Sequence, residues 1–202
     1  MPDVQSLTAE LNTVLTDASA SRRTTMLQQM TVLFLEGAES FSNEQFALFD
    51  TVFMALSKNT ERKALIELSS RLTAVKIAPP DIVKRLACDD DIAIAGPVLK
   101  SFDALVDDDV AEIGAKKGAA HLAAIADRQS INESVTDALI GRAVPEISRK
   151  IVAHQGARIS HLGFVKLLNA AKTDRQLAEM IASRADLPDE LQPFIKMILE
   201  KP

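Results

Sequence analysis

The sequence contains no tryptophan, no tyrosine, one cysteine and only seven glycines in 202 residues. Strands favour aromatic and β-branched side chains, whereas this chain is rich in Ala, Leu, Glu, Lys and Arg, which favour helices. A sheet is therefore poorly supported. The lone cysteine, Cys88, excludes an internal disulfide, and with 47% hydrophobic residues the chain is expected to bury a core without one.

Long apolar runs are missing too. The most apolar stretch, residues 26–35, contains two Gln and a Thr, whereas a membrane-spanning helix needs about 20 predominantly apolar residues. No segment combines the basic start, apolar middle and small-residue cleavage site of a secretory signal. We therefore expect a cytoplasmic protein without membrane contact.

The chain also has fewer basic residues, 23 Lys and Arg, than acidic ones, 28 Asp and Glu. The formal net charge is -5, and non-specific nucleic-acid binding depends on a positive surface that displaces counterions from phosphates. The aromatic rings of Trp and Tyr, on which bases stack, are absent. Nucleic acid is accordingly a disfavoured partner.

Apolar residues at helical spacing, by contrast, are abundant. One stripe runs through residues 7–18, and a second runs from Met26 to Phe34 and stops at Gly37. Ser42 and Gln45 form a capping-box pattern that predicts the start of a third helix. That helix places three aromatic rings on one face, and we expect them to join the N-terminal helices to the repeat array or to a second copy of the chain. These rings are Phe46, Phe49 and Phe53.

From Pro79 onward the helices become shorter and two pairs of segments align. The segment IVKRLACDDDIAIAGPVL from Ile82 matches VTDALIGRAVPEISRKIV from Val135, and HLAAIADRQSINESV from His121 matches LAEMIASRADLPDEL from Leu177. The spacing predicts a unit long enough for two helical hairpins. Pro80, Pro145 and Pro188 suit helix starts, whereas Pro97 and Pro193 fall inside apolar runs and predict a kink or a restarted helix.

The predicted fold is therefore all-α, with about a dozen helices and no sheet. We expect a HEAT-like helical repeat (α-solenoid) of antiparallel helix pairs over residues 77–202 as one continuous unit. An N-terminal helical part, residues 1–76, is expected to pack on this array.

Two further runs of the sequence resemble a known family. LACDDDIAIAGPVLKSFDALVDDDVAEI and HLAAIADRQSINESVTDALIGRAVPEISRKIVAHQGARIS are similar to a bacterial family, frequent in alphaproteobacteria, that is known only as a domain of unknown function with HEAT-like repeats. The resemblance covers about residues 60 to 170. It implies the helical-repeat fold and brings no agreed activity, so it implies no catalytic residue.

Candidate chemistry is sparse. The acidic triplets Asp89–Asp91 and Asp107–Asp109 lack the glycine and distal Glu of a calcium loop, and helix capping explains them better. The three histidines, His121, His154 and His161, have no zinc-ligand spacing. No hydrolase or phosphate-loop motif is present, so neither a metal nor a cofactor is expected. Cys88 ends an apolar stripe, where a lone cysteine usually behaves as a small hydrophobe.

His121 and Arg128 lie two helical turns apart on one side of a predicted helix, and Arg128 recurs as Arg184 in the second aligned segment. They form either a polar binding site for a phosphate or carboxylate, or a structural tie to a helix C-terminus or a capping Asp. The recurrence favours the tie.

Charge is segregated along the array. Residues 89–112 contain eight acidic residues and one basic residue, whereas residues 138–175 contain seven basic and two acidic ones. The basic segment is expected to gather four cations on a partner-binding surface for an acidic protein. These are Arg149, Lys150, Arg158 and Lys166, with Arg149 projecting into solvent.

The function expected from these features is a non-enzymatic protein-binding or regulatory scaffold, because stacked hairpins give an extended surface and no catalytic constellation accompanies it. A homodimer is left open. The alternative is a nucleic-acid-binding or DNA-repair-type HEAT-like protein. A third reading, an enzyme using His121 and the acidic triplets, requires a deep pocket that joins them.

Overall fold

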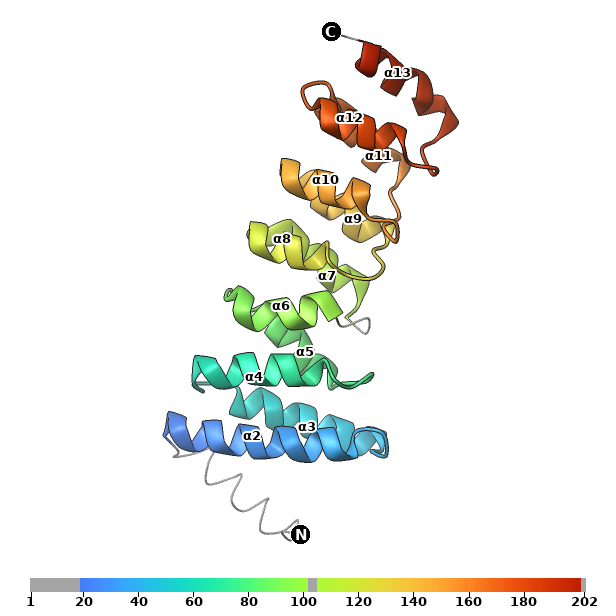
Figure 1. Cartoon of the computed structure of the whole chain (residues 1–202). Helices are drawn as coiled ribbons and strands as arrows, with labels where there is room; N and C mark the ends of the chain where they lie inside the picture. The colour runs from blue at the N-terminus through green and yellow to red at the C-terminus, as the bar shows by residue number, and fades with distance from the viewer. Residues whose placement is uncertain (1–18, 102–104, 201–202) are drawn as a thin grey trace. The chain divides into compact units, whose positions relative to one another are not determined.

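The computed structural model describes residues 19–101 and 105–200. These residues form twelve α-helices and one short 3-10 helix, and no strand occurs among them (Figure 1). The all-α prediction is confirmed. The helix predicted over residues 7–18 lies outside the described residues.

Two compact units make up the chain, and the first ends at Leu105 while the second begins at Val106. The boundary that the sequence suggested between residues 76 and 77 lies inside the first unit. The reason is packing, because α4 contacts both α5 and α6 across that position.

The first unit is built from two rows of helices. In one row α2 packs on α4 and α4 on α6, and in the other α3 packs on α5. Neighbouring helices of the two rows, such as α2 and α3 or α5 and α6, also contact each other. The helices are α2 (Ala20–Gly37), α3 (Asn43–Leu56), α4 (Arg62–Leu72), α5 (Pro80–Ala87) and α6 (Ile92–Ser101).

Phenylalanine rings close the α2–α3 hairpin. Phe34 of α2 is fully buried, and its ring centroid lies 5.2 Å from that of Phe49 and 5.7 Å from that of Phe53. Phe41 stacks on Phe49 at 4.9 Å, and Phe46 meets Phe34 edge-on. These described ring–ring contacts all lie within the α2–α3 hairpin, so the rings help to hold that hairpin together, and α3 in turn packs on α5.

Helix starts in the first unit follow local sequence signals. Ser42 and Gln45 form both bonds of the predicted capping box. Pro80 occupies the first position of α5, whose amides Asp81 N and Ile82 N donate to the buried Asp50 carboxylate at 2.9 and 2.8 Å. Of the kink or restart expected at Pro97, the restart does not occur, since α6 runs through this residue from Ile92 to Ser101.

The second unit repeats a single hairpin. In one row α7 packs on α9, α9 on α11 and α11 on α13, and in the other α8 packs on α10 and α10 on α12. The helices are α7 (Asp107–Lys116), α8 (Ala119–Ile125), α9 (Glu133–Gly141), α10 (Pro145–Ala153), α11 (His161–Ala171), α12 (Arg175–Ala182), η1 (Asp189–Leu191) and α13 (Gln192–Glu200).

The repeat is therefore shorter than the sequence alignment suggested. Successive hairpins of the second unit start at Asp107, Glu133 and His161, so the aligned segments matched every second hairpin. Stacked hairpins are compatible with the predicted solenoid inside each unit, and their HEAT-like character stays a prediction. Pro193 lies in the first turn of α13, directly after η1, so the expected helix restart is found there.

Candidate functional site

The four predicted partner-binding cations do not form one cluster. Arg149 of α10 binds Asp174, the N-cap residue of α12, through Nε at 3.0 Å and Nη2 at 2.9 Å. Its side chain is 35% exposed. The expectation that Arg149 projects into solvent is therefore wrong, because the acidic cap of the next hairpin lies within reach of its guanidinium.

Asp174 is held as a carboxylate from two sides. The backbone amide of Leu177 donates to Oδ1 at 3.0 Å, and this bond lowers the pKa of Asp174, partly opposed by desolvation and aided by Arg149. The pair Arg149–Asp174 thus links α10 to the first turn of α12.

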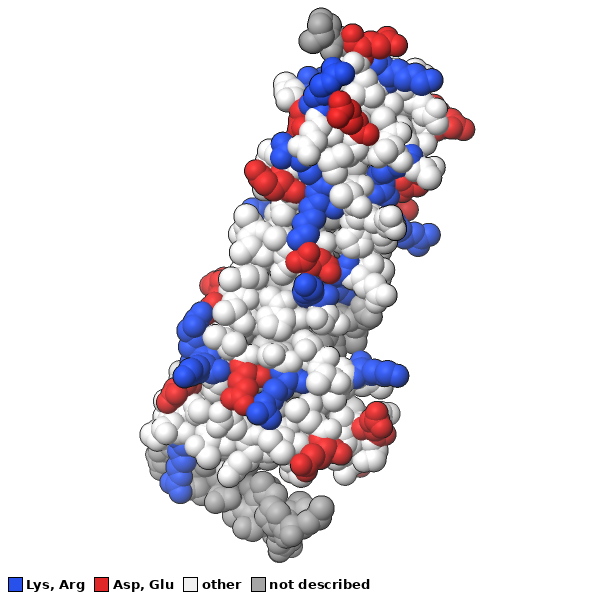
Figure 2. Space-filling model, viewed as in Figure 1, with Lys and Arg blue, Asp and Glu red and all other residues white. Residues whose placement is uncertain are grey.

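Lys150 is engaged in a similar way. Its Nζ lies 2.6 Å from Asp127 Oδ1 and donates to the Ala123 carbonyl at 3.1 Å, so it ties α10 to the end of α8. Arg158 and Lys166 are exposed, and neither side chain forms an ion pair with any residue that the structure describes. On the face shown in Figure 2, basic and acidic side chains lie close together rather than in one-sign areas.

Arg184 has the geometry of the predicted structural tie to a helix C-terminus. Arg184 Nη1 donates to the carbonyls of Val152 and His154, at the end of α10, at 2.9 and 3.2 Å. Nη2 donates to the Ala157 carbonyl at 2.9 Å and to Asp186 Oδ2 at 2.7 Å. The hydrogen bond from Arg184 lowers the pKa of Asp186, against the opposing effect of desolvation.

Arg142 makes a related tie that sequence reasoning missed. Its Nη1 donates to three carbonyls at the end of α7, those of Gly114, Ala115 and Lys117, at 3.0, 3.0 and 2.7 Å. The guanidinium thus satisfies carbonyl groups that the helix end leaves without an intrahelical donor. Arg142 therefore joins the end of α9 to the end of α7.

His121 and Arg128 are each only 5% exposed and belong to the core of the second unit. The carbonyl of Arg128 also accepts a 2.7 Å hydrogen bond from His154 Nε2, while His154 Nδ1 accepts from the Gly156 amide at 3.0 Å. Burial and these contacts point to a structural role at this end of α8.

The acidic triplets and Cys88 offer no binding site either. Asp91 accepts from the Ala93 amide at the start of α6, and Asp107–Asp109 form the first turn of α7, which fits the capping interpretation. Cys88 is exposed, so it is not the buried hydrophobe that its stripe suggested. No group of three or more His, Cys, Asp or Glu side chains that could hold a metal ion occurs in the described part of the chain.

The helices are also unsuited to crossing a bilayer. Within residues 19–101 and 105–200, none of them combines the length and the apolar character that a membrane span requires.

A hollow with a largely apolar lining lies between α11 and α13. In α13, five of the six residues from Phe194 to Leu199 are apolar, whereas a surface helix needs about three or four apolar residues per two turns to cover one face of a core. Ile195 is buried and serves that purpose. Phe194 and Met197 are 55% and 58% exposed, so they form a second apolar face.

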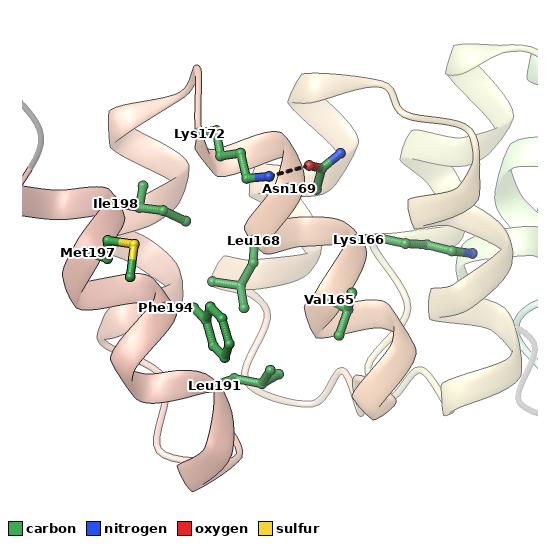
Figure 3. Close-up of a pocket in the computed structure, with 9 residues that line it drawn as sticks. All are labelled: Val165, Lys166, Leu168, Asn169, Lys172, Leu191, Phe194, Met197 and Ile198. Carbon is green, nitrogen blue, oxygen red and sulfur yellow. Dashed lines mark hydrogen bonds between the residues drawn. The ribbon is translucent and has the colours of Figure 1, made fainter.

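We call this hollow the apolar groove. Its volume is about 590 Å3, and Figure 3 shows Phe194 pointing toward Leu168 and lying near Leu191, with Met197 and Ile198 further along α13. Its polar lining residues are Lys166, Asn169 and Lys172, and no acidic residue of the described chain lines it. Lys172 Nζ donates to Asn169 Oδ1 at 2.9 Å, and Lys172 forms no ion pair with the residues that the structure describes.

A second hollow, which we call the basic pocket, lies on the other side of α11. Its volume is about 740 Å3, and its charged lining residues are Arg149, Lys166, Arg175 and Asp174. Two of the four predicted cations, Arg149 and Lys166, thus meet here, while Lys150 and Arg158 do not line it. The apolar groove itself was missed by sequence reasoning, although the excess of apolar residues in α13 was a signal for it.

Comparisons with known proteins find a family match. Residues 94–193 match the family model DUF2336, described as an uncharacterised protein conserved in bacteria. No curated protein and no solved structure matches the chain. The matched segment includes α11 and η1, and the α13 residues of the apolar groove come directly after it.

Proposed function

We propose that the chain, whose residues 94–193 are similar to this bacterial family of uncharacterised function, is a non-enzymatic scaffold that holds an amphipathic helix of a partner protein in the apolar groove. The observation that supports the proposal is the exposure of Phe194 and Met197 over a hollow lined by further apolar residues. Contiguous apolar surface of this kind marks binding sites more often than single exposed residues do.

The shape of the groove favours a helix over a small molecule. A small-molecule site usually buries about 70–90% of its ligand, whereas Phe194 and Met197 on the α13 side of the groove are themselves more than half exposed and do not enclose one. A groove between two helices is instead the surface on which an amphipathic helix lays its apolar stripe, with anchors at i, i+3, i+4 and i+7.

The charges around the groove specify the partner further. Among the described residues, the charged ones that line it are all lysines, so a helix with acidic residues flanking its apolar stripe complements it and a basic helix is repelled. The nucleic-acid alternative gains no support from this surface, since two lysines over an apolar floor neither track a phosphate backbone nor stack bases.

The absence of Trp and Tyr supplies a direct test. Phe194→Trp introduces the single indole of the chain into the groove, and Leu48→Trp places one at a position of similar exposure, 61%, outside it. A displayed library of random peptides is selected on the full chain, and selected peptides without Trp or Tyr are titrated into both variants. We expect a blue shift of the Phe194→Trp emission alone, and loss of peptide binding in Phe194→Asp but not in Leu48→Asp.

Other occupants would be recognised in the same experiment. A blue shift that grows with protein concentration without peptide, together with a doubled mass in light scattering that Phe194→Asp abolishes, would make the occupant a second copy and overturn the proposal. Selected peptides that bind Phe194→Asp as well as the unaltered chain would overturn it too. Binding of a labelled duplex oligonucleotide at physiological salt would favour the nucleic-acid alternative.

A further inference from the structure

The basic pocket and the apolar groove are two sides of one surface. Lys166 and Asn169 of α11 line both hollows. In Figure 3, Lys166 starts beside the groove and extends away from Phe194, toward the preceding hairpin. Its Nζ ends 4.0 Å from where a Cβ on Gly141 would lie, at the C-terminus of α9. A chain segment seated in the groove can therefore continue across α11 into the basic pocket.

The charge of the basic pocket is not balanced by its own residues. Arg149 and Asp174 neutralise each other at 2.9 Å. Lys166 has no ion pair with any described residue, and the pair Arg175–Glu179 is about 60% exposed on both sides, which makes it a weak surface contact. Polar groups of Ser148, Asn169 and Thr173 also line the pocket. The pocket thus offers cationic and neutral hydrogen-bond donors with one engaged carboxylate.

We infer that the basic pocket receives an acidic side chain, Glu or Asp, of the same partner segment whose apolar stripe fills the groove. This inference rests on the proposed function and deepens it, because it assigns the order of apolar and acidic residues along the partner segment as well as their presence. The apolar anchors lie against α13, and the carboxylate lies beyond them, on the α9–α10 side of α11. Lys166 Nζ donates to that carboxylate and fixes the direction in which the segment crosses α11.

The test uses the peptides selected from the displayed random library on the full chain. We expect Glu or Asp to be enriched at one end of the apolar motif. For one selected peptide, affinity is measured against the unaltered chain and against Lys166→Glu. The matched control is Lys196→Glu, an exposed α13 residue that lines neither hollow and gives the same change in net charge. Lys166→Glu should weaken binding about tenfold and Lys196→Glu less than twofold.

A peptide in which the enriched Glu is replaced by Gln completes a double-mutant cycle between this side chain and Lys166. It should bind the unaltered chain about tenfold more weakly, and Lys166→Glu should cost it little more, because the contact is already absent. A peptide with Lys at that position should prefer Lys166→Glu. Peptides that depend on Phe194 but show no acidic enrichment, or no coupling to Lys166, overturn the pocket assignment alone. The absence of any Phe194-dependent peptide overturns the proposed function together with it.

Discussion

Gly156 lies where two connecting segments of the second unit touch. The amide of Ile131 donates to the Gly156 carbonyl at 3.1 Å, and the amide of Arg158 donates back to the Ile131 carbonyl at 2.8 Å. A Cβ on Gly156 would stand only 2.4 Å from the carbonyl oxygen of Gln129. Backbone cannot swing aside as a side chain can, so this position requires glycine for close approach rather than for turn conformation.

We therefore predict that Gly156→Ala destabilises the chain by about 1–3 kcal/mol, the usual cost of overpacking. Gly118→Ala is the matched control, because nothing lies within 4 Å of a Cβ there, and it should cost under about 1 kcal/mol. Urea unfolding followed by circular dichroism at 222 nm measures both, since the chain has no Trp or Tyr to report by fluorescence. Equal effects of the two substitutions would contradict this account of Gly156.

The lowered pKa of Asp174 predicts how the stability of the chain changes in acid. Its folded-state pKa is lowered, first by the Leu177 amide and then by Arg149, whereas an unfolded Asp titrates near 3.9. The unfolded chain therefore takes up the proton first, so the contribution of Asp174 is complete above about pH 4 and is lost as pH falls through the lower folded value.

Asp174→Asn should accordingly make the free energy of unfolding depend less on pH in this acidic range. Asn still caps a helix but carries no charge, so the variant should be less stable than the unaltered chain near pH 6 and should lose less stability between about pH 5 and pH 3. Urea midpoints at several pH values measure the difference. Parallel profiles for the two proteins would show that the Asp174 carboxylate is not stabilised in the folded state.

At the scale of elements, the aromatic cluster of the α2–α3 hairpin carries a stability prediction. Phe49 is 8% exposed and contacts Phe34, Phe41 and Phe53. Phe49→Ala should therefore cost about 3 kcal/mol or somewhat more, through lost burial and a cavity. Leu48→Ala removes a neighbouring side chain that is 61% exposed and should change the urea midpoint little. A midpoint left unmoved by Phe49→Ala would mean that the hairpin does not depend on these rings.

Helix starts were predictable because their determinants are local. The capping box at Ser42 and the proline at position 145 act within one turn, and both helices begin there. The repeat length was not predictable, because the residues that recur most visibly lie in alternate hairpins. Arg142 follows α9 and Arg184 follows α12, so similar ties to helix ends come from different sequence contexts.

The candidate site was less predictable than the helices. A count of cations could not show that Asp174 and Asp127 lie beside Arg149 and Lys150, because those contacts cross from one hairpin to the next. The apolar residues of α13 were visible in the sequence, but which of them stay uncovered depends on how α13 packs on α11 and α12. Packing left Phe194 exposed and buried Ile195.

At the scale of the whole molecule, the net negative charge belongs mainly to one part of the sequence. Residues 1–105 contain ten Lys and Arg against fourteen Asp and Glu, whereas residues 106–202 contain thirteen against fourteen. The unit that holds the groove is therefore nearly neutral. An acidic partner meets no strong general repulsion from it, so the local cations decide the electrostatic contribution to binding.

This balance predicts the salt dependence of peptide binding. Screening acts over about 30 Å at 0.01 M salt but only about 8 Å at 0.15 M. If attraction to the basic pocket outweighs repulsion by the whole chain, an acidic peptide that depends on Phe194 should bind more weakly at each step from about 0.01 to 0.3 M salt. In Lys166→Glu the trend should vanish or reverse, because the nearest cation becomes an anion, while Lys196→Glu should keep it. Affinity that rises with salt in the unaltered chain would mean that the overall charge of -5 dominates, and that the cations of α11 do not steer the partner.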